Sequence, residues 1–116
     1  MTVNAFFEQA LSDLGEIEKA YLDITGSNIN MTVPWYIMAA YAYYKQDNPI
    51  LEDATFDRLA KKILANWDSI DHRHKEYLTK DMLEGGTYLG KYPPQIEGAL
   101  SSVRDIYKPK KPRRKR

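Results

Sequence analysis

The amino-acid sequence predicts an all-α fold, a small domain of four to five helices. Apolar residues recur three and four positions apart in successive stretches of the chain, which is the spacing of one helical face. Prolines and glycines fall between these stretches, and no stretch alternates apolar and polar residues as a half-buried strand does. With 116 residues, 43% of them hydrophobic, the chain can bury one modest core but not two. We therefore expect a helical domain over residues 1–107, built around a helix–loop–helix hairpin at 34–67, and a basic tail over residues 108–116.

The first helix is expected in the stretch "NAFFEQALSDLGEIEKAYLDI", with Asn4 or Thr2 available as its N-cap. The stretch "TGSNINMT" then interrupts the helical spacing. One face of the helix carries the apolar residues Phe6, Phe7, Ala10, Leu11, Leu14, Ile17, Ala20, Tyr21 and Ile24.

The second helix is expected to begin at Pro34, because a proline in the first turn has no N–H that the helix needs. It continues through "WYIMAAYAYYK", which is apolar around most of its circumference and therefore predicts a central helix of the core. The stretch "DNPILE" should form a loop, because the residue before Pro49 is pushed out of helical geometry.

The third helix is expected to have Asp53 as its N-cap. A shorter helix should follow, capped by Thr79 and ended by Gly85 and Gly86, and then an irregular aromatic segment. A last helix should begin near Pro94. The apolar stripe of the third helix consists of Phe56, Leu59, Ala60, Ile63, Leu64 and Trp67, and that of the last helix consists of Ile96, Leu100, Val103, Ile106 and Tyr107.

The composition excludes several classes of function. The chain has no cysteine, which excludes a disulfide framework, a cysteine nucleophile and a zinc–thiolate site. No apolar run approaches the ~18 residues that a membrane span needs, and the N-terminus does not have the pattern of a signal peptide. We therefore expect a soluble, cytoplasmic protein that does not contact a membrane.

Catalytic and metal-binding motifs are also missing. His72 and His74 in "DHRHKEY" could ligate a metal together with Asp71, but their spacing places them on different sides of a helix, so we expect no metal site. The glycines near residue 86 are not followed by the Lys-Ser/Thr pair of a phosphate-binding loop. No serine or threonine has a recognisable base partner. We therefore expect that the chain is not an enzyme.

The stretch "YAYYKQDNPILEDATFDRL" (41–59) resembles the N-terminal helical domain, called Ia, of NAD-dependent DNA ligases. The family pattern is roughly Tyr-x-Tyr-His-x-x-Asp-x-Pro-x-x-x-Asp-x-x-Tyr-Asp-x-Leu. Two positions differ, since Tyr44 stands in place of the histidine and Phe56 in place of the second tyrosine. The residues that match without a gap are Tyr41, Tyr43, Asp47, Pro49, Asp53, Asp57 and Leu59.

This resemblance implies a binding site for the nicotinamide mononucleotide (NMN) half of NAD. It implies that Tyr43 packs on the nicotinamide ring, that Asp53 and Asp57 make polar contacts, and that Tyr44 and Phe56 occupy the two altered positions of the same site. A positively charged ring over a tyrosine is a cation–π pair, and two carboxylates four residues apart on a helix project to the same side. The implied ligand is NMN or NAD, and we expect no other cofactor.

The resemblance does not extend to the catalytic part of a ligase. The sequence contains no Lys-x-Asp-Gly, the motif with the lysine that becomes adenylated, and the 57 residues after Leu59 are too few for a nucleotidyltransferase domain. We therefore expect the ligase-like domain as a stand-alone chain. A scaffold without ligand is the alternative, in which Asp53 caps a helix, Asp57 is a favourable charge near a helix N-terminus and the aromatic residues fill the core.

The tail "KPKKPRRKR" separates charge from the rest of the chain. It contains seven of the 17 basic residues and no acidic one, so residues 1–107 carry 10 basic and 16 acidic residues. Its prolines favour an extended chain, disordered or ordered by a partner, which suits the phosphate backbone of DNA or RNA. An acidic protein surface, or no specific partner, are the alternatives. The residues expected to contact nucleic acid are Lys108, Lys110, Lys111, Arg113, Arg114, Lys115 and Arg116.

Two functions are therefore expected from the sequence. The first is a non-catalytic nucleic-acid-associated or assembly protein, such as a phage-encoded virion or replication component, which also contacts another protein and is found in the cytoplasm or inside a virion. The alternative is an NMN- or NAD-binding module that acts in trans with a nucleotidyltransferase or sequesters its ligand.

Overall fold

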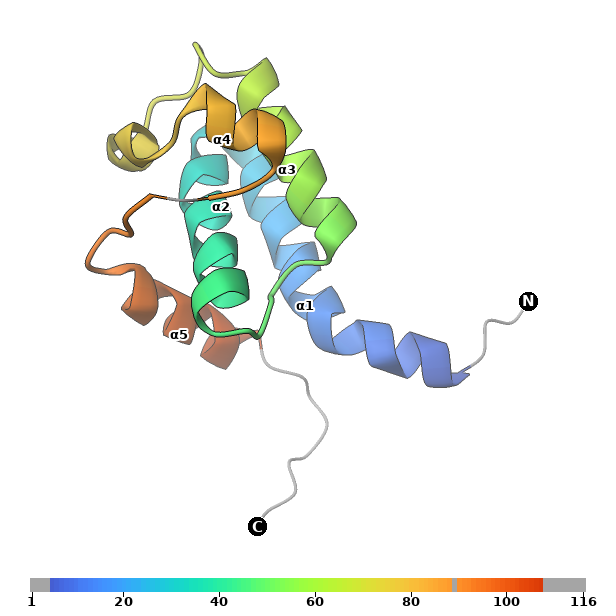
Figure 1. Ribbon diagram of the computed structural model, residues 1–116. Coiled ribbons are helices and arrows are strands. Elements are labelled where there is room, and N and C mark those ends of the chain that lie inside the picture. Colours follow the sequence, from blue (N-terminus) through green and yellow to red (C-terminus); the bar gives the residue numbers. More distant parts are fainter. Residues whose placement is uncertain (1–4, 89, 108–116) are drawn as a thin grey trace.

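The computed structural model describes residues 5–88 and 90–107, with side chains from residue 15 onward. Within these residues the chain forms helices and no strand, which confirms the all-α prediction. Helix α2 lies in the middle, and the other helices are arranged around it (Figure 1). The five α-helices are α1 (Ala5–Ser27), α2 (Thr32–Ala40), α3 (Asp53–Ala65), α4 (Lys80–Gly85) and α5 (Ile96–Ile106).

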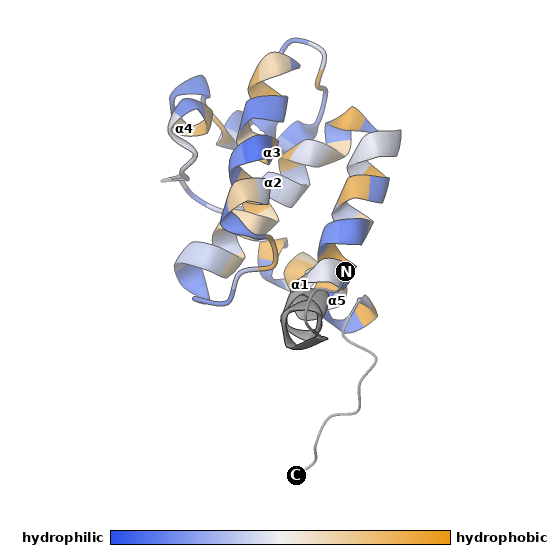
Figure 2. Cartoon of the chain, turned by 90° about the vertical axis from the view of Figure 1, so that its right-hand side faces the viewer, coloured by the Kyte–Doolittle hydropathy of each residue, from blue (hydrophilic) through white to orange (hydrophobic). Residues whose placement is uncertain are grey.

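Helix α1 packs on the core through the C-terminal part of its predicted apolar stripe. Ile17 and Tyr21 are buried, and the Tyr21 ring meets Trp35 of α2 edge to face, with centroids 5.7 Å apart. The predicted caps Asn4 and Thr2 lie outside the described residues. In Figure 2, hydrophobic and hydrophilic bands alternate along the helices, as expected where one face of each helix covers the core. Among the described residues, no helix is long and apolar enough to cross a membrane.

Helix α2 begins two residues earlier than predicted. A short 3-10 helix, η1 (Ile29–Met31), leads directly into it, and the hydroxyl of Thr32 donates to the carbonyl of Ile29 at 2.6 Å. Pro34 still lies in the first turn, where the missing N–H is not needed. The prediction of a central helix is confirmed, since Val33, Tyr36, Ile37 and Ala40 are fully buried.

The chain leaves α2 through one π-helical turn, η2 (Tyr41–Lys45). The backbone N–H of Gln46 donates to the carbonyl of Tyr41, five residues back, at 3.2 Å, and the N–H of Asn48 donates to the carbonyl of Ala42 at 2.9 Å. Such wide turns accommodate one extra residue, and they occur frequently at functional sites. The loop then reverses direction with Asp47 at φ 52°, which is a conformation that Asp and Asn adopt more readily than most residues.

Helix α3 begins one residue earlier than the predicted cap implies. Glu52 is the N-cap, with an extended backbone, and Asp53 is the first residue of the helix, so the assignment of Asp53 as N-cap was wrong. The capping contacts come from another helix instead. The carboxylate of Glu18 on α1 accepts the N–H of Glu52 at 2.6 Å and the hydroxyl of Thr55 at 3.1 Å.

Helix α4 follows the sequence closely, whereas α5 begins two residues after Pro94 and leaves Ile106 of its predicted stripe 68% exposed. Helix α4 is capped by Thr79, as predicted, with the hydroxyl accepting the N–H of Met82 at 3.1 Å. It ends at Gly85, and Gly86 follows in the left-handed conformation, so the predicted glycine pair does terminate it. Between α3 and α4 the chain forms a 3-10 helix, η3 (Arg73–Tyr77). Helix α5 packs against α2 with Ile96 and Leu100 buried. The guanidinium of Arg104 on α5 donates to the side chain of Gln46 at 2.9 Å and to the carbonyl of Asn48 at 2.6 Å, and thereby holds the loop between α2 and α3.

Candidate functional site

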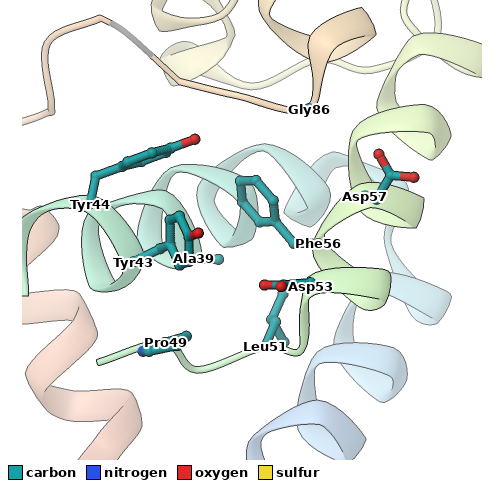
Figure 3. A pocket seen from close by; sticks show the side chains of 9 residues that line it. All are labelled: Ala39, Tyr43, Tyr44, Pro49, Leu51, Asp53, Phe56, Asp57 and Gly86. Carbon is teal, nitrogen blue, oxygen red and sulfur yellow. The ribbon is translucent and has the colours of Figure 1, made fainter. Parts of the chain in front are cut away.

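A pocket opens where α2, its π-turn and α3 meet (Figure 3). Its volume is about 170 Å³, which is close to the ~150 Å³ of a protein cavity that holds one benzene ring. The structure places all five residues of the predicted site, Tyr43, Tyr44, Asp53, Phe56 and Asp57, around this pocket, and Ala39, Pro49, Leu51 and Gly86 complete its lining.

One side of the pocket is aromatic. Tyr43 and Tyr44 come from the π-turn, and their rings meet edge to face with centroids 4.9 Å apart. Both side chains are unusually exposed for such large aromatic groups, 47% for Tyr43 and 45% for Tyr44. Part of each ring is therefore accessible to a planar ligand.

The other side of the pocket is acidic. Asp53 and Asp57 are one turn apart on α3 and both are exposed. In Figure 3 the carboxylate of Asp53 points toward Tyr43, whereas Asp57 lies beyond Phe56, next to Gly86. Asp57 pairs with Lys61 at 3.5 Å, and because both side chains are more than half exposed, this ion pair is weak and leaves the carboxylate available to a ligand.

Phe56 forms the base between these two sides and is supported from beneath by Tyr36. Their rings stack with centroids 4.6 Å apart and planes 12° apart. Tyr36 is buried, and its hydroxyl donates to the carbonyl of Thr87 at 2.7 Å. Burial raises the pKa of Tyr36 above its ordinary value, and nearby Tyr44 and Asp57 add to this shift, so the phenol stays neutral and remains a donor. This hydrogen bond holds the segment after α4 against α2.

Gly86 closes the pocket at the end of α4. A Cβ atom at this position would lie 3.1 Å from Oδ1 of Asp57, and the backbone has φ 65°. Only a glycine adopts this conformation without strain while leaving room for the carboxylate. The sequence predicted this glycine as a helix terminator, but its spacing from residue 57 gave no signal that the two would meet.

Other predicted features lie away from the pocket. Nδ1 of His72 accepts the backbone N–H of His74 at 3.0 Å, and within the described residues no group of three metal-ligating side chains comes together. Tyr88 is buried, and its ring lies 4.8 Å from that of Tyr92, so Tyr88 serves packing rather than an exposed surface. The seven basic tail residues lie outside the described residues.

Residues 37–82 match the family model of the DNA ligase-like, N-terminal NAD+-binding domain. This match confirms the resemblance that the stretch 41–59 indicated, and it extends that resemblance from α2 to α4. Comparisons with curated proteins and with solved structures gave no significant match. Gly86 and the supporting residues Glu18 and Arg104 lie outside the matched segment.

Proposed function

We propose that this chain is a binding module for nicotinamide nucleotides, NMN or NAD. One observation carries the proposal: five residues chosen from the sequence line a single pocket whose volume fits one aromatic ring. The tyrosine faces favour a flat, positively charged ring, and the carboxylates of Asp53 and Asp57 accept hydrogen bonds from an amide or from ribose hydroxyls. The match to an NAD+-binding family supports the same ligand.

The altered positions are compatible with this ligand. Phe56 has no hydroxyl to offer, but its ring, stacked on Tyr36, gives the pocket a rigid apolar base. Tyr44 supplies an exposed phenol where the family pattern has a histidine. The volume of the pocket fits the ring alone, so the phosphate of the nucleotide would lie outside it. The module binds the ligand and does not itself cleave it, because the sequence has no Lys-x-Asp-Gly.

Calorimetry and thermal unfolding with NMN and NAD test this proposal. Ligand at ~100 times its dissociation constant should stabilise the fold by about 2.7 kcal/mol, which for a domain of this size raises the Tm by about 10 °C. Asp53→Asn and Asp57→Asn should lose most of this shift, whereas Asp68→Asn, an exposed aspartate just after α3, should keep it. No shift at millimolar ligand would leave the scaffold interpretation.

A trans-acting role and a sequestering role are distinguished by one further assay. A ligase nucleotidyltransferase without its own Ia domain is incubated with NAD and this chain, and formation of the adenylated lysine is measured. A module that presents NAD should stimulate the reaction at low NAD concentration. A module that only sequesters NAD should inhibit it.

Nucleic-acid binding is a second candidate function, favoured by the charge separation along the sequence. Seven basic residues within nine, next to a domain with an excess of acid, suit a phosphate backbone. If all seven engage DNA, the log–log salt slope of binding should be roughly −6, from ~0.9 per phosphate contact. A chain ending at residue 107 should lose DNA binding and keep its affinity for NMN, so gel shifts with the two chains test this function separately.

A further inference from the structure

The pocket has a marked charge polarity. Asp53 and Asp57 form one side, and Tyr43 and Tyr44, both uncharged, form the other (Figure 3). A nicotinamide nucleotide combines a cationic ring with an anionic phosphate. The two carboxylates attract the ring and repel the phosphate, which favours an exit of the phosphate away from Asp57, on the tyrosine side.

Lys45 does not line the pocket itself, but it is the neighbour in sequence of Tyr44, which does. It follows Tyr44 directly as the last residue of the π-turn, and its side chain is exposed. Its ammonium group is 6.0 Å from the ring centroid of Tyr92, at the outer limit of a cation–π contact, so the ring holds it only weakly. The Tyr92 ring meets Tyr41 edge to face at 5.0 Å, which fixes the surface over which the lysine lies.

The other lysine near the pocket is less suited to a phosphate. Lys61 lies on α3, at the acidic side, and its ammonium group is 3.5 Å from Oδ2 of Asp57. A phosphate there would have to approach the same carboxylate. A lysine on a flexible stem at the opposite side meets no such repulsion.

We propose that Lys45 binds the 5′-phosphate of a nicotinamide nucleotide whose ring occupies the pocket. This inference rests on the proposed function and adds a selectivity to it: the module prefers the nucleotide to the nucleoside. Position 45 is one that the ligase family pattern leaves open, so the resemblance does not assign this role. A single turn of backbone would then supply contacts to both ends of the mononucleotide, tyrosines for the ring and a lysine for the phosphate.

Titration calorimetry with NMN and with nicotinamide riboside, which differ only in the phosphate, tests the inference. The full chain should bind NMN about three- to tenfold more tightly than the riboside, the effect expected of one exposed charge-assisted contact. Lys45→Met should remove this preference by weakening NMN alone. Raising the salt concentration should weaken the attraction between the carboxylates and the ring for both ligands, and should also lower the NMN-to-riboside ratio of affinities.

Lys19→Met is the matched control, because Lys19 is exposed on α1, away from the π-turn, and carries the same charge. It should retain the preference for NMN, and thermal unfolding of both variants checks their fold. If Lys45→Met keeps the NMN-to-riboside ratio, or if the wild-type chain binds both equally, the inference is wrong while the proposed function stands. If the wild-type chain binds neither ligand, both are wrong.

Discussion

Replacing Glu18 by alanine should loosen the start of α3, and with it the acidic side of the pocket. The carboxylate of Glu18 bridges two helices, since it accepts hydrogen bonds from the backbone N–H of Glu52 and from the hydroxyl of Thr55. Glu52, the N-cap, makes no side-chain capping bond of its own. The first turn of α3, which carries Asp53, therefore depends on a residue that lies 34 positions earlier in the chain.

The expected loss of stability follows from these contacts. Removing a capping side chain costs about 1 kcal/mol, and losing a negative charge near a helix N-terminus costs about 0.5 kcal/mol more. The buried hydroxyl of Thr55 loses its acceptor, which adds about 1 kcal/mol, and its remaining contact with Arg58, at 3.4 Å, is weak. Because such terms overlap, we expect a total of about 2 kcal/mol, or about 8 °C in Tm for a domain of this size.

Urea and thermal unfolding, followed by far-ultraviolet circular dichroism, measure this loss. Glu16→Ala is the control, since Glu16 is exposed on the same helix and its removal should stay within about 0.5 kcal/mol of wild type. Glu18→Gln keeps an acceptor without the charge and should fall between the two. If the Glu18→Ala and Glu16→Ala variants unfold alike, the cap from α1 does not support α3 and the reasoning is refuted.

Three further predictions concern single positions. Gly86→Ala should destabilise the fold by about 1 kcal/mol or more and weaken NMN binding, because of the positive φ and the contact with Asp57. The control is Gly98→Ala, in open space within α5, which should stabilise the fold by about 0.5–1 kcal/mol. Equal changes in the free energy of unfolding of the two variants in denaturant titrations would contradict the prediction. Burial lowers the pKa of His72 below 6.5, so the unfolded chain takes up a proton first and stability should fall as the pH drops below about 6.5. Thermal melts of His72→Asn, which keeps a capping acceptor, should show a smaller loss of stability in acid. Burial raises the pKa of Tyr88 from 10.0 to about 12, so stability present below pH 10 should decline toward pH 12, and Tyr88→Phe should reduce that decline in urea titrations across this range.

The helices were predictable because each buries one face with a regular spacing. The stripe on α3 includes Leu59, Ala60 and Ile63, all fully buried in the structure. The cap of α4 was predictable for a local reason, since Thr79 acts on an N–H only three residues ahead. The convergence of the pocket residues followed from a short loop and from two carboxylates one helical turn apart. That these residues contact a nucleotide stays a prediction.

The parts that the sequence did not reveal depend on contacts between distant residues or on subtle backbone changes. Glu18 caps a helix from another helix, and nothing in the local sequence around it signals this. Arg104 fixes the loop from 56 residues beyond Asn48. The π-turn is hidden because "YAYYK" continues the apolar, aromatic composition of α2, so a shift from an α-turn to a π-turn leaves no break in the pattern.

The π-turn at the end of α2 also determines the direction in which its side chains point around the helix axis. A π-turn takes up one residue more than an α-turn, so deleting one residue within Tyr41–Lys45 would restore ordinary helical winding and shift the side chains of this turn around the helix axis. The hairpin between α2 and α3 would still close, but different side chains would face the pocket. The length of this one turn therefore decides which side chains line the pocket.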